Sequence, residues 1–207
     1  MPDKINYQLV LDRSIKEITT TGAVPRLLLH SCCAPCSSYC LEYLSEYFKI
    51  TVLYYNPNIE DEEFERRYKE QLRLVNELKT KYPVTVIKGS HDTGIYYDAV
   101  AGHENDAEGG DRCKICFELR LSEAAKYAKE NGFDFFTTTL SISPLKDAQL
   151  LNAIGDEMSK RYGVKYLYSD FKKKNGYLRS VELSKKYSLY RQDYCGCVFS
   201  KKQNLPE

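Results

Sequence analysis

The chain has 207 residues, of which 43% are hydrophobic and 29% are charged, and its formal net charge is +1. This length suits one domain with small appendages, and the composition excludes disordered and collagen-like chains. No segment approaches the roughly 20 consecutive apolar residues that a membrane-spanning helix needs. The first 21 residues mix acidic and basic side chains, unlike a secretory signal, so we expect a cytoplasmic protein that does not engage a membrane.

Short apolar runs and amphipathic stretches alternate along the chain. After an N-terminal helix over residues 5–20, strands are predicted at 26–30, 50–55, 84–87, 133–138 and 165–168. Helices are predicted up to residue 47 and over 60–81, 113–131 and 146–161, and a long acidic loop over 91–111 contains one helical turn at 96–101. The alternation predicts an α/β fold, doubly wound around a mostly parallel sheet, with ligands at the carboxyl ends of the strands. We expect residues 1–24 to form a helical extension and residues 25–207 a single α/β catalytic domain.

Charge is distributed unevenly along the chain. Residues 158–207 contain twelve Lys or Arg and four Asp or Glu, whereas the preceding residues contain 18 basic and 25 acidic side chains. This asymmetry is typical of a surface that meets a polyanion such as RNA. The phosphate-contact candidates are Lys172, Lys173, Lys174, Lys185, Lys186 and Arg191, and the base-stacking candidates are Tyr177, Tyr187 and Tyr190.

The eight cysteines are the most informative residues in the sequence. In a reducing compartment they favour metal binding or thiol chemistry over structural disulfides. The spacings Cys33-x-x-Cys36 and Cys113-x-x-Cys116 together form a pattern typical of a four-thiolate metal site. Cys40, one helical turn after Cys36, is expected to lie in the hydrophobic core.

Two metal chemistries fit this set of thiols. A closed zinc site needs four ligands and leaves Cys32, Cys195 and Cys197 unused. An iron–sulfur cluster accompanied by a second metal or a dithiol uses the set more fully, and is favoured for that reason. The pair Cys195 and Cys197, separated by one glycine, either forms a strained, redox-active disulfide or binds metal through both thiolates.

Several separated segments carry a resemblance to a known family. They are Leu28–Ser38, Tyr55–Ile59 with Glu65 and Arg66, Asp111–Leu121, Thr138–Pro144 with Lys146, and Tyr190–Ser200. From about residue 26 to residue 200 the chain resembles the QueH family of epoxyqueuosine reductases. The resemblance implies a Rossmann-like sheet of the adenine-nucleotide alpha-hydrolase type. It also implies a cobalamin-independent oxidoreductase that removes the epoxide oxygen of epoxyqueuosine at the wobble position of tRNA, the last step of queuosine biosynthesis.

The same resemblance implies roles for individual cysteines. Cys32, Cys33, Cys113 and Cys116 would be the ligands of a [4Fe-4S] cluster. Cys195 and Cys197 would be a redox-active pair or the ligands of an adjacent mononuclear iron. Cys36 stands where some relatives carry Asp, which is compatible with a ligand of a second metal.

The remaining site candidates follow from the chemistry of this reaction. Converting an epoxide into an alkene and water takes two electrons and two protons, so an electron donor, not identified by the sequence, is implied as a partner. The proton-donor candidates are Asp111, Asp193 and Tyr194. Asn56, Asn58 and Arg66 are candidates for binding the ribose or the cyclopentene diol of the substrate.

Two other functions remain as alternatives. An ATP-dependent tRNA-modifying enzyme of similar fold would place a pyrophosphate loop at residues 31–38, but that segment lacks the glycine that lets backbone amides approach a phosphate. A zinc-binding RNA module would tolerate replacement of Cys195. His30, His91 and His103 have no paired spacing and are expected to be structural or exposed.

Overall fold

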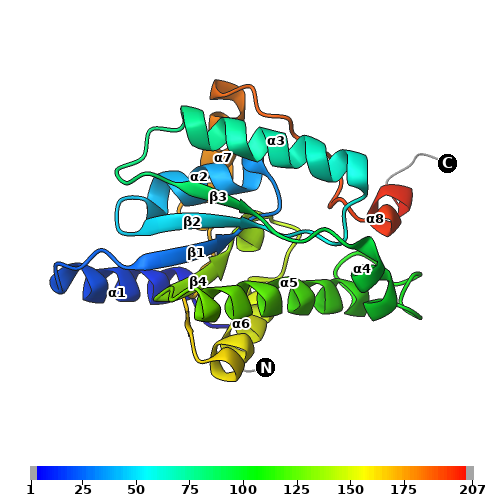
Figure 1. The fold of residues 1–207 in the computed structure, drawn as a ribbon, viewed down its shortest axis with the longest axis horizontal. Helices are drawn as coiled ribbons and strands as arrows, with labels where there is room; N and C mark the ends of the chain where they lie inside the picture. Colours follow the sequence, from blue (N-terminus) through cyan, green and yellow to red (C-terminus); the bar gives the residue numbers. More distant parts are fainter. Residues whose placement is uncertain (1–3, 204–207) are drawn as a thin grey trace.

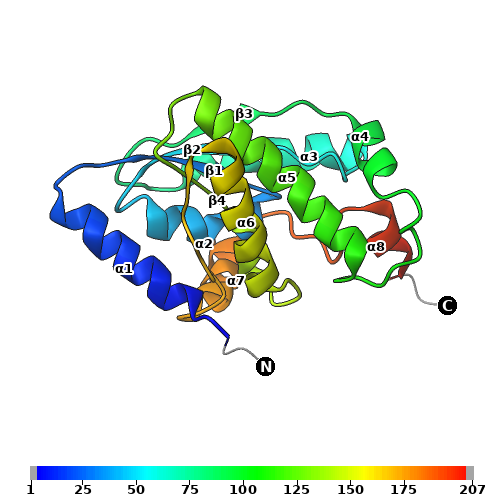
Figure 2. The same cartoon turned by 90° about the horizontal axis from the view of Figure 1, so that it is seen from below.

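The computed structural model describes residues 4–203 and contains a five-stranded, all-parallel sheet with helices on both faces (Figures 1 and 2). The strands are β1 (Arg26–His30), β2 (Lys49–Tyr54), β3 (Thr85–Lys88), β4 (Phe135–Thr138) and β5 (Lys165–Tyr166). Their order across the sheet is β3-β2-β1-β4-β5. This arrangement confirms the predicted doubly wound fold.

Alternating side chains of the central strand β1 build two separate cores. Leu28 faces the helices α5 (Asp111–Glu130) and α6 (Ala148–Tyr162), whereas Leu27 and Leu29 face the other layer. That second layer contains α1 (Tyr7–Thr20), α2 (Ala34–Leu44) and α3 (Asp61–Glu77). All three leucines are fully buried. The central strand of a parallel sheet is covered by helices on both faces, and for this reason its sequence is apolar without interruption.

The N-terminal helix is packed against the body of the protein. Leu11 and Ile15 contribute to the core beside α2, and Tyr7 stacks on Tyr168. Asp12 forms an ion pair with Lys174 at 2.7 Å. Among the residues that the structure describes, no helix has both the length and the apolar character needed to cross a membrane.

The helical turn predicted at 96–101 in the acidic loop corresponds to α4 (Thr93–Ala99). The tail, for which no element was predicted, contains α7 (Gly176–Lys186) and α8 (Val198–Gln203). Helix α7 begins very close to α2, since a Cβ on Gly176 would lie 2.5 Å from the ring of Tyr39. The same Cβ would lie 1.9 Å from the carbonyl oxygen of Phe171 in the preceding turn. The tail therefore packs against α2 and belongs to the same domain.

Candidate metal and thiol site

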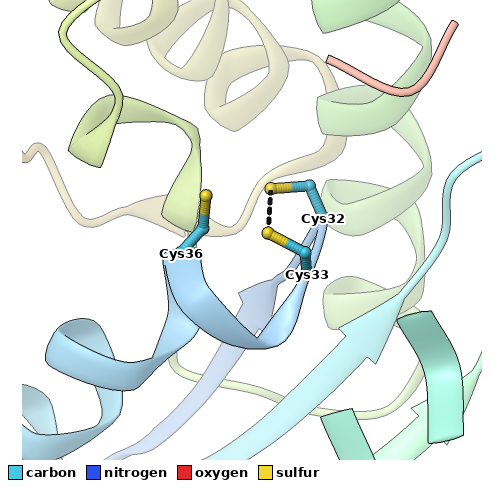
Figure 3. Close-up of side chains that lie close together, drawn as sticks. All are labelled: Cys32, Cys33 and Cys36. Atoms are coloured by element: carbon cyan, nitrogen blue, oxygen red, sulfur yellow. Dashed lines mark hydrogen bonds between the residues drawn. The ribbon is translucent and has the colours of Figure 1, made fainter. Parts of the chain in front are cut away.

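Three cysteine sulfurs gather where β1 ends and α2 begins. The sulfurs of Cys32, Cys33 and Cys36 lie within 4.8 Å of one another, and those of Cys32 and Cys33 are 3.8 Å apart (Figure 3). Cys33 precedes the first residue of α2, and Pro35 sets the backbone for the first helical turn. We call these three residues the thiol trio. Its spacing and its soft ligands fit a thiophilic metal.

The protonation of the trio is strongly coupled. Hydrogen bonding with Cys33 holds the pKa of Cys32 well below its usual value, assisted by Cys36 and by the charges of Arg120 and Lys146. The thiolate of Cys32 in turn raises the pKa of Cys33 to about 12 and that of Cys36 well above its usual range. The trio thus carries one negative charge readily and resists further ionisation unless a bound metal replaces the protons.

A cavity of about 360 Å³ opens in front of the thiol trio, at the carboxyl ends of the strands. Besides the trio, its wall includes Arg67, Arg120, Lys146, Arg191, Tyr194 and Cys195. Four cationic side chains therefore surround one small volume. Such a cavity suits an anionic ligand or a negatively charged metal centre.

Cys195 lines this cavity and belongs to a network of polar contacts. Its sulfur lies 3.4 Å from Nζ of Lys146, a side chain that is only 11% exposed, and Lys146 lies 4.0 Å from the carboxylate of Glu108. Ser200 donates its hydroxyl to Glu108 and its backbone N–H to the sulfur of Cys197, and its Oγ also accepts from the backbone N–H of Cys195. The network links both cysteines of the C-terminal pair to the acidic loop.

The remaining predicted ligands lie beside that pair. Cys116 and Cys197 are buried in one small cluster with Tyr96 and Val100, and burial raises the pKa of Cys116 to about 12. Cys113 is half-buried, and its sulfur accepts from the backbone N–H of Gly109. Among the described residues, the sulfur that lies within 4.8 Å of both Cys32 and Cys33 is that of Cys36. Cys113 and Cys116 do not belong to this group.

The predicted substrate-binding residues in the loop between β2 and α3 and on α3 itself have different surroundings. Asn56 is buried, donates to the carbonyl of Ser31 at 2.9 Å and accepts from Arg120. Asn58 is also buried, and its amide has no hydrogen-bond partner among the described residues. Arg66 is exposed and stacks on the ring of Tyr190 at 3.5 Å. None of the three predicted residues lines the cavity.

The predicted phosphate contacts of the basic tail also have different surroundings. Lys172 donates to two backbone carbonyls and pairs with Asp170 at 2.8 Å, and Lys174 is held by the ion pair described above. Lys173 is exposed. Arg191 lines the cavity and donates to the hydroxyl of Tyr177 at 3.2 Å, so it is the predicted phosphate contact that the structure places at the site.

Among the proton-donor candidates, Asp193 and Tyr194 line the cavity. Asp111 is exposed at the first residue of α5 and lies instead beside His103 and Asp106.

Two structural predictions are confirmed. Cys40 is fully buried in the core, and His30 is buried between Thr138 and the carbonyl of Tyr55. Burial lowers the pKa of His30 to about 3.

Three residues that line the cavity, Arg67, Arg120 and Glu108, were not predicted from the sequence. For the two arginines, the available signal was a charged side chain on the buried face of a helix, since Arg67 follows Phe64 by three residues and Arg120 follows Phe117 by three.

Comparison with known proteins places the whole described body of the chain in one family. The family model described as "Epoxyqueuosine reductase QueH" matches residues 27–203. The chain is 45% identical over 202 residues to the epoxyqueuosine reductase QueH of Streptococcus pyogenes serotype M1, covering 96% of this chain and 79% of that protein. The protein of the same name from Staphylococcus aureus is 43% identical, over 97% of this chain and 85% of its own length. That from Thermotoga maritima is 34% identical, over 84% and 89%. The chain therefore belongs to the QueH family of epoxyqueuosine reductases.

Proposed function

We propose that the protein is an epoxyqueuosine reductase that removes the epoxide oxygen of epoxyqueuosine at the wobble position of tRNA, the final step of queuosine biosynthesis. The observation that carries this proposal is that the thiol trio and Cys195 open onto the same cationic cavity. A substrate in this cavity would therefore contact both the metal-binding thiols of the trio and the separate thiol of Cys195. The family membership supplies the reaction, and the cavity supplies a place for it.

The thiol trio fits a metal group by its donor chemistry. Cys32, Cys33 and Cys36 would hold it, and Cys113 and Cys116 at the start of α5 are the candidates for further ligands. We infer a [4Fe-4S] cluster, with an adjacent iron as a second possible centre. Such a group would supply electrons singly and a Lewis acid for the epoxide oxygen.

The C-terminal pair, Cys195 and Cys197, supplies the electrons and protons that the reaction consumes. When the thiols of Cys195 and Cys197 form a disulfide, they release the two electrons and two protons that convert the epoxide into an alkene and one water. A reductant from outside the chain, the electron donor, then restores the dithiol. Lys146 holds the Cys195 sulfur at the cavity wall, and Asp193 and Tyr194 are placed to pass protons from solvent.

The tRNA would approach at the side of the cavity where Arg191 and Tyr177 lie. Arg191 provides charge for a phosphate, and the exposed Tyr177 ring provides a face for a neighbouring base. Lys173 extends the same basic tail. A cytoplasmic location, where tRNA and reductants occur together, forms part of this proposal.

The test combines metal analysis with conversion of the substrate. Protein purified without oxygen is analysed for iron and sulfide, then incubated with epoxyqueuosine-containing tRNA and a reductant, and the nucleosides are measured by mass spectrometry. We expect iron, sulfide and a product lacking one oxygen atom. Cys195→Ala should abolish conversion, whereas Cys40→Ala, at a thiol in the core, should retain it. A protein without iron that leaves the nucleoside unchanged would contradict the proposal, and zinc alone would favour an RNA-binding module.

A further inference from the structure

Two arginines in the cavity wall are buried in an unusual way. Arg67 is 2% exposed and Arg120 is 0% exposed. Each retains a buried nitrogen that has no hydrogen-bond partner among the described residues, Nη2 in Arg67 and Nε in Arg120. A buried guanidinium nitrogen without a hydrogen-bond partner is costly, so its retention points to a further acceptor or anion in the cavity.

Both side chains are fixed in place by residues outside the thiol trio. Nε of Arg67 donates to Glu63 at 2.6 Å, and Nη1 donates to the carbonyl of Cys195 at 3.4 Å. Arg120 donates to the side-chain oxygen of Asn56, and its Nη1 lies 3.9 Å from the sulfur of Cys116. Within residues 4–203, no carboxylate forms an ion pair with Arg120 at 4.0 Å or less.

Cysteine sulfurs surround the two arginines. Arg67 and Arg120 line the same cavity as the thiol trio and Cys195. Arg120 also lies beside Cys116 on α5. A metal centre held by these cysteines would therefore lie close to both guanidinium groups.

We propose that Arg67 and Arg120 are positioning residues for the thiolate-bound metal centre, and that their charge and N–H donors raise its reduction potential. This inference rests on the proposed function, because it requires that the thiol trio hold a redox-active metal. Reduction adds negative charge to such a centre, and nearby cations and hydrogen-bond donors stabilise that added charge. The two guanidinium groups thus make the centre easier to reduce.

The decisive measurement is the midpoint potential of the bound metal centre. Holoenzyme purified anaerobically is titrated with dithionite, and reduction is followed by visible absorbance and electron paramagnetic resonance. The variants are Arg67→Met, Arg120→Met, Arg67→Lys and Arg120→Lys. Arg161→Met is the matched control, because it removes one positive charge from an exposed position on α6 outside the cavity wall.

We expect both Met variants to shift the midpoint to more negative potentials, both Lys variants to shift it less, and the control to match the wild type. Turnover should fall in kcat while KM for tRNA stays unchanged. If a Met variant does not fold or loses its metal, the Lys variant at that position carries the test.

Two results would count against the inference in different ways. Metal-loaded variants with a wild-type midpoint overturn it and leave the proposed function intact; if KM for tRNA also rises, the arginines bind the substrate instead. A wild-type protein that holds no redox-active metal refutes the proposed metal centre, and the inference falls with it.

Discussion

Replacing Gly196 by alanine tests whether the C-terminal thiol pair needs its present backbone path. Gly196 lies between Cys195 and Cys197 with φ +112, a conformation that L side chains rarely adopt. A Cβ there would lie 2.9 Å from Nη1 of Arg67 and 3.0 Å from Cγ1 of Ile59. Both neighbours are buried, so they have little room to move away.

The expected cost has two parts. Strained backbone costs about 1–3 kcal/mol, and overpacking against buried neighbours costs about 1–3 kcal/mol more. Because small proteins are stabilised by only about 5–15 kcal/mol, the variant should remain folded but lose a measurable part of its stability. The chain relieves the strain most easily by moving the thiols, so we expect conversion of epoxyqueuosine to fall steeply.

Urea unfolding and single-turnover conversion measure the two effects of Gly196→Ala separately. Gly102→Ala is the matched control, since Gly102 also has positive φ, +84, but a Cβ there would meet no atom within 4 Å. The control should show the backbone cost alone and wild-type conversion. If Gly196→Ala is as stable as Gly102→Ala and converts substrate at the wild-type rate, the close approach has no functional meaning.

Three further predictions concern the tail, the substrate and the metal. The hydrogen bond from Arg73 lowers the pKa of Glu70, so ionised Glu70 stabilises the fold above its unfolded pKa of about 4.3. That stabilisation is lost as pH falls through the lower folded value. The difference in unfolding free energy between wild type and Glu70→Gln should therefore shrink from pH 6 to pH 3 in urea titrations; a constant difference would argue against it. Arg191→Ala should weaken tRNA binding and reduce its salt dependence in filter-binding assays, while the ion-paired Lys174→Ala should do neither, and equal effects would contradict the assignment. Anaerobic removal of the metal by a chelator should lower the thermal unfolding midpoint, and an unchanged midpoint would show that the thiol trio holds no structural metal.

The predictable part of the fold came from side-chain periodicity. Apolar runs located all five strands, although β5 contains only Lys165–Tyr166 and ends before the predicted residue 168. Helix α7 escaped prediction because its buried face carries Gly176, Ser180 and Ser184 as well as Leu183. Small residues allow close packing against α2, but they do not create the large apolar stripe that identifies a helix in a sequence.

The site was predictable where it is local. Cys32, Cys33 and Cys36 lie within five residues at the start of one helix, so their proximity follows from the chain itself. The positions of Cys195 and Cys197 depend on the path of the tail around the domain, which no local pattern specifies. Glu108 lies in the acidic loop, and only the fold shows that it contacts Lys146 and Ser200.

The excess of thiols and the buried positive charge are best understood together. Arg120 occupies the apolar face of α5 without an ion-paired carboxylate among residues 4–203, and Cys32 is the trio member whose pKa is lowered. Each group offsets part of the desolvation cost of the other, because an unpaired buried charge is more costly than a buried pair. Removing Cys32 would therefore leave a guanidinium without its anion, and the proposed metal centre without one of its ligands. This dependence gives a physical reason why charged residues occupy buried helix faces in a domain whose core is otherwise built from leucines, phenylalanines and alanines.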